Sequence, residues 1–209
     1  MIVIINYGMG NVGSIRNMIR KFTKDVIISS EIKDIENAEK LILPGVGSFD
    51  AGMKNLHHLN IIDLLNRRVL EDKIPVLGIC LGMQLLSSRS EEGTQEGLNW
   101  ISGETIKFRF KENNNNLKIP HMGWNYVKKI RESELLENMY SESRFYFVHS
   151  YHVVCENEED VILKTLYGIE FTSALQRNNI FGVQFHPEKS HKYGLQLLKN
   201  FIEYKVNNG

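Results

Sequence analysis

Cysteine is scarce in this sequence, with only Cys80 and Cys155 among 209 residues. Two cysteines cannot build the disulfide framework of a small secreted protein, so we expect a reducing, cytoplasmic environment. The first residues, 1–5, are apolar but carry no basic segment and are too short for a signal peptide, so we expect them to form a buried strand. No apolar run approaches the length of a membrane span.

The sequence also lacks an excess of charge of either sign. It contains 25 basic and 25 acidic residues, and its isoelectric point is about 7.1. This balance provides no electrostatic basis for binding nucleic acid or an anionic membrane. We also find no internal repeat and no second-domain boundary, and therefore expect residues 1–209 to form one domain with a single substantial core.

What the sequence does contain is an alternation of short apolar runs and helical patterns. Four buried-strand patterns, each followed by helix-like spacing or a loop, predict a mostly parallel, doubly wound, flavodoxin-like α/β sheet. The expected strands cover residues 2–5, 26–28, 40–43 and 75–79. The expected helices cover residues 14–24, 52–70 with a break near Asn60, and 81–86, the last as a short amphipathic helix.

The second half is different, because strand patterns follow one another with turns between them and predict an antiparallel extension. These expected strands cover residues 104–110, 125–130, 145–148, 151–156, 161–166, 171–176 and 180–185. A polar loop containing Asn113–Asn116 interrupts them. A final helix is predicted over residues 191–204, with Ser190 as its N-cap.

The segment around Cys80 has the pattern of a nucleophile elbow. Gly78 and Gly82 flank the cysteine in the order Gly-x-Cys-x-Gly, after an apolar strand and before a helix. In such an elbow a sharp, strained turn raises the side chain above the sheet, and glycines allow the strand and helix backbones to pass closely. The helix N-terminus would favour the thiolate. The alternative is that Cys80 is only a small buried hydrophobic residue.

A second candidate is the tripeptide His186-Pro187-Glu188, at the end of a predicted strand. Proline restricts its own backbone and that of the preceding residue, so we expect His186 and Pro187 to be extended. Residues i and i+2 of an extended chain project to the same side, which pairs the imidazole with the carboxylate. Together with Cys80 this predicts a Cys–His–Glu triad for acyl transfer. The alternative is an ordinary surface turn.

Acyl transfer also requires donors for the oxyanion. The N–H of Leu81 directly follows the candidate nucleophile, and the flexible loop Gly45-Val46-Gly47 follows a neighbouring strand. We therefore predict Leu81, Val46 and Gly47 as the oxyanion site. The alternative for the loop is that its glycines only make a turn.

The spacing Gly8-x-Gly10-x-x-Gly13 supports a competing function, because it matches the dinucleotide-binding pattern of a nucleotide-dependent oxidoreductase. That hypothesis leaves Cys80, His186 and Glu188 unexplained. The other histidines show no ligand spacing, and we expect His149 and His152 to point to opposite faces of a strand. We therefore predict no metal site and no cofactor.

The elbow and the His-Pro-Glu tripeptide resemble the class I, or triad, glutamine amidotransferases. Further stretches resemble the glutaminase subunits of imidazole glycerol phosphate synthases within that family: residues 6–11 (NYGMGN), 43–49 (LPGVGSF), 120–125 (PHMGWN), 147–151 (FVHSY) and 186–190 (HPEKS). The similarity extends from residue 2 to about residue 202. It implies hydrolysis of L-glutamine to glutamate and ammonia, with Cys80 as nucleophile, His186 as general base and acid, and Glu188 as the orienting carboxylate.

The resemblance also implies a glutamine site, a heterodimer with a barrel-fold synthase (cyclase) subunit, and a role in histidine biosynthesis. The implied glutamine-binding residues are Gly47, Gln84, Glu92, Ser150 and Tyr151, and the implied partner-interface residues are Asn11, Trp124, Tyr146 and Lys189. The segment 11–15 and Asn6 depart from the pattern of histidine-pathway members. Amidation of a surface-polysaccharide sugar therefore remains an alternative use of the same ammonia.

Overall fold

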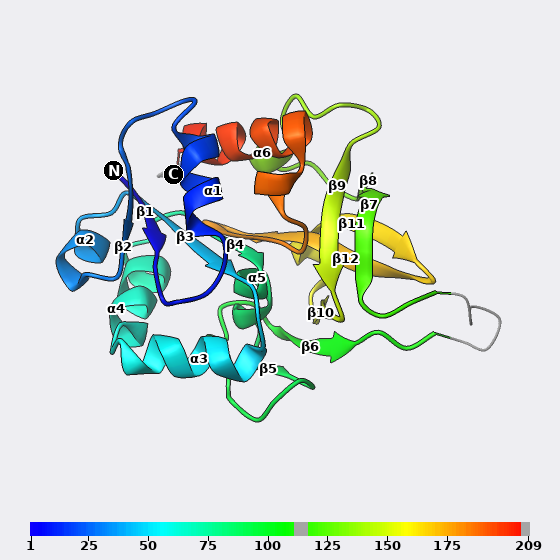
Figure 1. Ribbon diagram of the computed structural model, residues 1–209, viewed down its shortest axis with the longest axis horizontal. Coiled ribbons are helices and arrows are strands. Elements are labelled where there is room, and N and C mark those ends of the chain that lie inside the picture. Colours follow the sequence, from blue (N-terminus) through cyan, green and yellow to red (C-terminus); the bar gives the residue numbers. More distant parts are fainter. Residues whose placement is uncertain (111–116, 206–209) are drawn as a thin grey trace.

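The computed structural model describes residues 1–110 and 117–205, and an eight-stranded sheet runs through its centre (Figure 1). The strands are arranged in the order β2 (Val26–Ser29), β1 (Ile2–Ile5), β3 (Lys40–Gly45), β4 (Val76–Cys80), β13 (Ile180–Val183), β12 (Ile169–Arg177), β11 (Val161–Tyr167) and β8 (Lys128–Lys129). The first five are parallel, and the last three continue the sheet in antiparallel fashion. The predicted α/β sheet with an antiparallel extension is confirmed.

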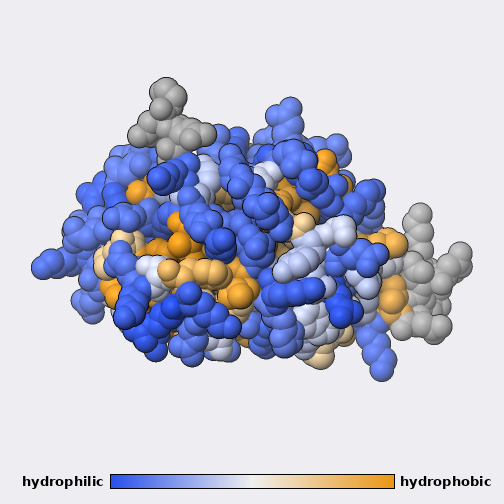
Figure 2. Space-filling view, turned by 90° about the horizontal axis from the view of Figure 1, so that it is seen from above, coloured by the Kyte–Doolittle hydropathy of each residue, from blue (hydrophilic) through white to orange (hydrophobic). Residues whose placement is uncertain are grey.

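Helices cover both faces of the parallel part. α1 (Val12–Ile19) and α6 (His191–Glu203) lie on one face, which Figure 2 shows from above, with apolar side chains gathered among hydrophilic ones. The other face carries α2 (Ile32–Glu36), α3 (Phe49–His58), α4 (Ile62–Asn66) with the π-helical turn Arg67–Glu71, and α5 (Leu81–Leu85).

The burial of β1 shows how the sequence pattern produces these two layers. Successive side chains of a strand point to opposite faces, so a strand covered on both sides must be apolar throughout. Ile2 and Ile4 pack with the α1–α6 layer, whereas Val3 and Ile5 pack with the layer of α2 to α5. All four residues are at most 6% exposed, as the continuous β-branched run predicts.

Two small sheets complete the second half. One contains β10 (Tyr151–Cys155), β6 (Gly103–Lys107) and β5 (Arg89–Ser90), and the other contains β7 (His121–Tyr126) and β9 (Arg144–His149). Short 3₁₀ turns occur at Glu134–Leu136, Glu158–Asp160 and Pro187–Lys189.

Several predicted boundaries were wrong. The helix expected over 14–24 is α1 and ends at Ile19, while the strand expected over 125–130 begins at His121 and breaks before β8. The short segments α2 and β5 were missed. The helix after Cys80 is not amphipathic, because all five residues of α5 are buried. The helix break near Asn60 is confirmed, and this residue has a φ of 54°.

Two further expectations concern membrane-spanning segments and the loop at Asn113–Asn116. Within residues 1–110 and 117–205, no helix is long and apolar enough to cross a membrane. The predicted loop at Asn113–Asn116 lies outside the described residues.

Candidate active site

Cys80 occupies a strained turn between β4 and α5. Its φ and ψ are 55° and −109°, and Leu81 begins the helix directly afterwards. The flanking glycines are required by close backbone approach, because a Cβ on Gly82 would lie 1.8 Å from the carbonyl oxygen of Leu43, and one on Gly78 would lie 2.7 Å from that of Gly82. The elbow geometry expected from the sequence is therefore present, with the strain that such a turn requires.

The His186 and Glu188 side chains form a buried pair. His186 Nδ1 lies 2.9 Å from Glu188 Oε1, and the two side chains are only 2% and 1% exposed. The backbone between them differs from the prediction: His186 is extended, but Pro187 begins a 3₁₀ turn. The fixed φ of proline suits the first position of a helical turn as well as a strand, so it does not by itself select extended backbone.

Ser190 holds the backbone of the candidate base rather than capping α6. Its hydroxyl donates to the His186 carbonyl (2.6 Å) and accepts from the Tyr146 N–H (3.0 Å), and it makes no side-chain bond to the helix N-terminus. Ser190 is therefore at the predicted N-cap position of α6, but its side chain does not make a capping bond. The Tyr146 carbonyl also accepts from the His186 N–H at 2.9 Å, so β9 and Ser190 together fix the position of the histidine.

The electrostatics of His186 favour its protonated form. Burial lowers its pKa, but the neighbouring Cys80 and Glu188 outweigh this and raise the pKa of His186 to about 10. Its Nε2 is buried and makes no hydrogen bond to a described group of the protein. A protonated imidazole with an uncommitted N–H beside a cysteine can stabilise a thiolate and donate a proton to a leaving group.

A cavity of about 250 Å³ opens above Cys80. It brings together every residue predicted to bind the oxyanion or glutamine, and its lining residues are Val46, Gly47, Cys80, Leu81, Gln84, Glu92, Pro120, Val148, His149, Ser150 and Tyr151. A larger, open hollow of about 820 Å³ lies elsewhere, between residues 131–137 and 176–179, and contains neither the cysteine nor the histidine. The smaller cavity is therefore the candidate substrate site.

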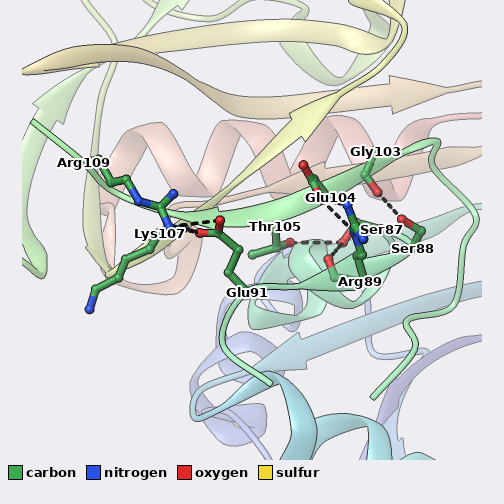
Figure 3. Close-up of polar contacts among 9 residues, drawn as sticks. All are labelled: Ser87, Ser88, Arg89, Glu91, Gly103, Glu104, Thr105, Lys107 and Arg109. Atoms are coloured by element: carbon green, nitrogen blue, oxygen red, sulfur yellow. Dashed lines mark hydrogen bonds and ion pairs between the residues drawn. The ribbon is translucent and has the colours of Figure 1, made fainter. Parts of the chain in front are cut away.

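The segment that carries Glu92 is held in place by polar contacts with β6 (Figure 3). The Glu91 carboxylate accepts from the Lys107 N–H (2.8 Å) and from the Arg109 guanidinium (3.0 Å), and these two contacts, in that order, lower its pKa. Glu92 Oε2 accepts from the Phe49 N–H at 2.8 Å, at the start of α3. One wall of the cavity is thus fixed to two separate elements.

Three of the four predicted interface residues lie together on the surface. The Trp124 and Tyr146 rings are 6.4 Å apart, and the Lys189 ammonium lies 5.6 Å from the Tyr146 ring. Trp124 is 42% exposed, which is unusual for so large an aromatic side chain. Asn11 is also exposed, and its side chain caps α1 by accepting from the Ser14 N–H.

Sequence reasoning missed a group of buried histidines at the cavity, one of which, His149, lines it. His149 and His152 do not point to opposite faces, because both rings pack against Phe108, at 5.2 and 4.8 Å. The chain turns at Ser150, between β9 and β10, so the strand alternation assumed for them does not apply. His121 Nδ1 lies 3.0 Å from His149 Nε2. No group of three or more metal-binding side chains occurs in the described ranges.

The comparison with known families agrees with this geometry. Residues 3–204 match the family described as glutamine amidotransferase class-I. The chain belongs to this family.

Several known proteins are similar to it over nearly their whole length. Subunit HisH 2 of imidazole glycerol phosphate synthase from Methanococcus maripaludis is 57% identical, over 97% of this chain and 99% of that protein. The protein of the same name from Pseudomonas aeruginosa is 49% identical over the same shares. A solved structure described as a glutamine amidotransferase has a TM-score of 0.70 at 17% identity, covering 94% of this chain and 98% of that one, and this similarity concerns the fold.

Proposed function

We propose that this chain is the glutaminase subunit of an imidazole glycerol phosphate synthase, hydrolysing L-glutamine and supplying ammonia for histidine biosynthesis. The observation that carries the proposal is the buried His186–Glu188 pair beside an elbow cysteine that lines a cavity of about 250 Å³. The similarity to HisH subunits supports the choice of pathway. The reaction needs a reduced Cys80 thiol, and cysteines are kept reduced in the cytoplasm, so we propose that the protein acts there. We also propose that the chain forms one domain.

The chemistry follows from the positions of these groups. The Cys80 thiolate attacks the carboxamide carbon, and the N–H of Leu81 with a donor from Val46 or Gly47 stabilises the oxyanion. His186 protonates the departing ammonia, leaving a thioester on Cys80. His186 then takes a proton from water, which hydrolyses the thioester to glutamate and restores the thiolate and imidazolium.

The walls of the cavity suggest how glutamine is held. We assign Gly47, Gln84, Glu92, Ser150 and Tyr151 to its binding, because all of them line the cavity. Glu92 uses one oxygen on the Phe49 N–H, and its second carboxylate oxygen can accept from the amino group of glutamine. Gln84 uses its amide N–H groups on Tyr151 and Gln184, so only its oxygen is available to a ligand.

We further propose a heterodimer with a barrel-fold synthase subunit that receives the ammonia. The exposed cluster of Trp124, Tyr146 and Lys189, with Asn11, is the surface assigned to this partner. Aromatic side chains and arginine are favoured at such interfaces, and the Arg144 guanidinium lies 5.7 Å from the Trp124 ring.

The test is steady-state glutamate release by the wild type and Cys80→Ala, each alone, with the synthase subunit, and with its imidazole-pathway acceptor. We expect the variant to lose about 10⁶-fold in turnover, since a nucleophile is removed. We expect partner and acceptor to raise wild-type turnover at least about a hundredfold, the effect of completing one oxyanion donor. Comparable rates for the variant would disprove the thioester route. Glutaminase activity without product from that acceptor would favour surface-sugar amidation instead.

A further inference from the structure

The sulfur of Cys80 has two polar neighbours besides the candidate triad. The Val148 carbonyl oxygen lies 3.9 Å from Sγ, and Nε2 of Gln184 lies 3.7 Å from it. Gln184 is completely buried, directly follows β13, and precedes His186 by two residues. The carbonyl can only accept and therefore favours the protonated thiol, whereas an amide N–H favours the thiolate.

The orientation of the Gln184 amide is determined by a chain of hydrogen bonds that ends on a backbone carbonyl. Gln84 Nε2 lies 3.0 Å from the Tyr151 carbonyl oxygen, which cannot donate, so the amide nitrogen of Gln84 must face it. The same nitrogen lies 3.1 Å from Oε1 of Gln184. If the Gln184 amide were flipped, two N–H groups would face each other and its oxygen would face the sulfur.

We propose that Gln184 is a catalytic hydrogen-bond donor to the Cys80 thiolate, held in its orientation by Gln84. This inference rests on the proposed role of Cys80 as nucleophile. His186 loses its proton when ammonia leaves, but an amide keeps its N–H throughout the cycle. Gln184 therefore stabilises the sulfur both as the attacking thiolate and as the thiolate that leaves when water hydrolyses the thioester. A charge-assisted bond in a buried site is among the stronger kinds.

The test measures alkylation of Cys80 by iodoacetamide across pH, with the modified peptide quantified by mass spectrometry and no glutamine present. Gln184→Glu keeps an acceptor toward Gln84 but turns an oxygen toward the sulfur. We expect the midpoint of the rate-against-pH curve to rise by at least about one pH unit, which lowers the rate about tenfold at lower pH, because the variant loses one bond to a charged group and adds a negative charge near the sulfur. Burial raises the pKa of the Cys155 thiol to about 12, so its slow alkylation serves as an internal reference.

Two further variants separate the donor from a structural effect. Gln184→Met removes the donor without adding charge, and we expect it to raise the midpoint less than Gln184→Glu does. If Gln184→Glu does not fold, Gln184→Met alone tests whether the amide donates to the sulfur. Asn179→Asp alters another buried amide, at the opposite end of β13 from Gln184, which donates to the Val69 and Ile74 carbonyls. This control is expected to lower the melting temperature and leave the midpoint unchanged.

The outcomes are distinct. An unchanged midpoint in a folded Gln184→Met variant, or an equal shift in Asn179→Asp, would overturn the assignment. Because iodoacetamide replaces glutamine, a shifted midpoint in a protein that hydrolyses no glutamine would support this donor while refuting the proposed function.

Discussion

The buried His152 makes the stability of this protein sensitive to acid. Its ring packs against both Phe108 and Phe171, and neither of its ring nitrogens makes a hydrogen bond to a described group. Burial lowers the pKa of His152 from its ordinary 6.5 to about 4. The unfolded chain therefore takes up a proton near pH 6.5 that the folded chain refuses until about pH 4, so stability is present above pH 6.5 and is lost as the pH falls.

Integrating proton uptake between pH 7.5 and pH 5.0 gives a loss of about 2 kcal/mol in the free energy of unfolding from this one residue. Replacing His152 with Leu removes the titrating ring while keeping its approximate volume, at a cost below about 1.5 kcal/mol at pH 7.5. The variant should then lose about 2 kcal/mol less than the wild type on going to pH 5.0. Urea unfolding at the two pH values measures both quantities.

A matched control is His58→Gln, which changes an exposed histidine at the end of α3. Its unfolding free energy should follow the wild type at both pH values. Parallel pH dependence of the wild type and His152→Leu would refute the reasoning, because it would mean that the folded protein accepts the proton on His152 as readily as the unfolded chain does.

Two further predictions concern the His186–Glu188 pair and the elbow. Glu188→Gln removes a negative charge that raises the pKa of His186. The alkaline limb of the pH–rate profile for glutamine hydrolysis should therefore move to lower pH. An unmoved limb would show that the Glu188 charge does not raise the pKa of His186. Gly82→Ala places a Cβ 1.8 Å from a backbone oxygen of β3 and should cost about 3 kcal/mol in urea unfolding. The control is Gly13→Ala in α1, where the new Cβ would meet no neighbouring atom within 4 Å. It should raise the free energy of unfolding by about 0.5–1 kcal/mol, because alanine is the better helix former. Equal effects of Gly82→Ala and Gly13→Ala on stability would contradict the packing argument.

The parts of the site that the sequence predicts are those set by local backbone chemistry. The glycines around Cys80 and the proline between His186 and Glu188 restrict the chain within a few residues, and the elbow and the buried pair follow from them. Family resemblance, rather than local pattern, was needed to find Gln84, Glu92 and Tyr151 at the cavity, because they come from three separate segments.

The features that sequence reasoning missed depend on contacts between distant segments. Ser190 looks like a helix cap by position, yet its hydroxyl lies between Tyr146 and His186, 44 and 4 residues away. His149 and His152 were assigned to opposite faces of one strand, although the predicted strands 145–148 and 151–156 leave a turn between them, and the structure places that turn at Ser150. Their packing on Phe108 depends on how β6 and β10 are paired, which is a tertiary property.

The glycine pattern at residues 8–13 shows how a motif can match a template for another reason. A Cβ on Gly10 would lie 3.0 Å from the backbone nitrogen of Gly45, and one on Gly47 would lie 2.6 Å from the methyl group of Met9. The Tyr7 hydroxyl donates to the Pro44 carbonyl in the same contact. The space beside this loop is thus filled by the segment 44–47, which argues against a nucleotide there.

That contact also has a consequence for gating by a partner. The segment 7–10 packs along the glycine loop that lines the cavity, and it leads directly to the exposed Asn11 at the start of α1. Interiors packed this closely transmit displacement, because neither segment can shift far without the other. A partner bound at Asn11 would therefore act on a segment already in contact with the proposed oxyanion donors, and this is the physical route by which docking can complete the site.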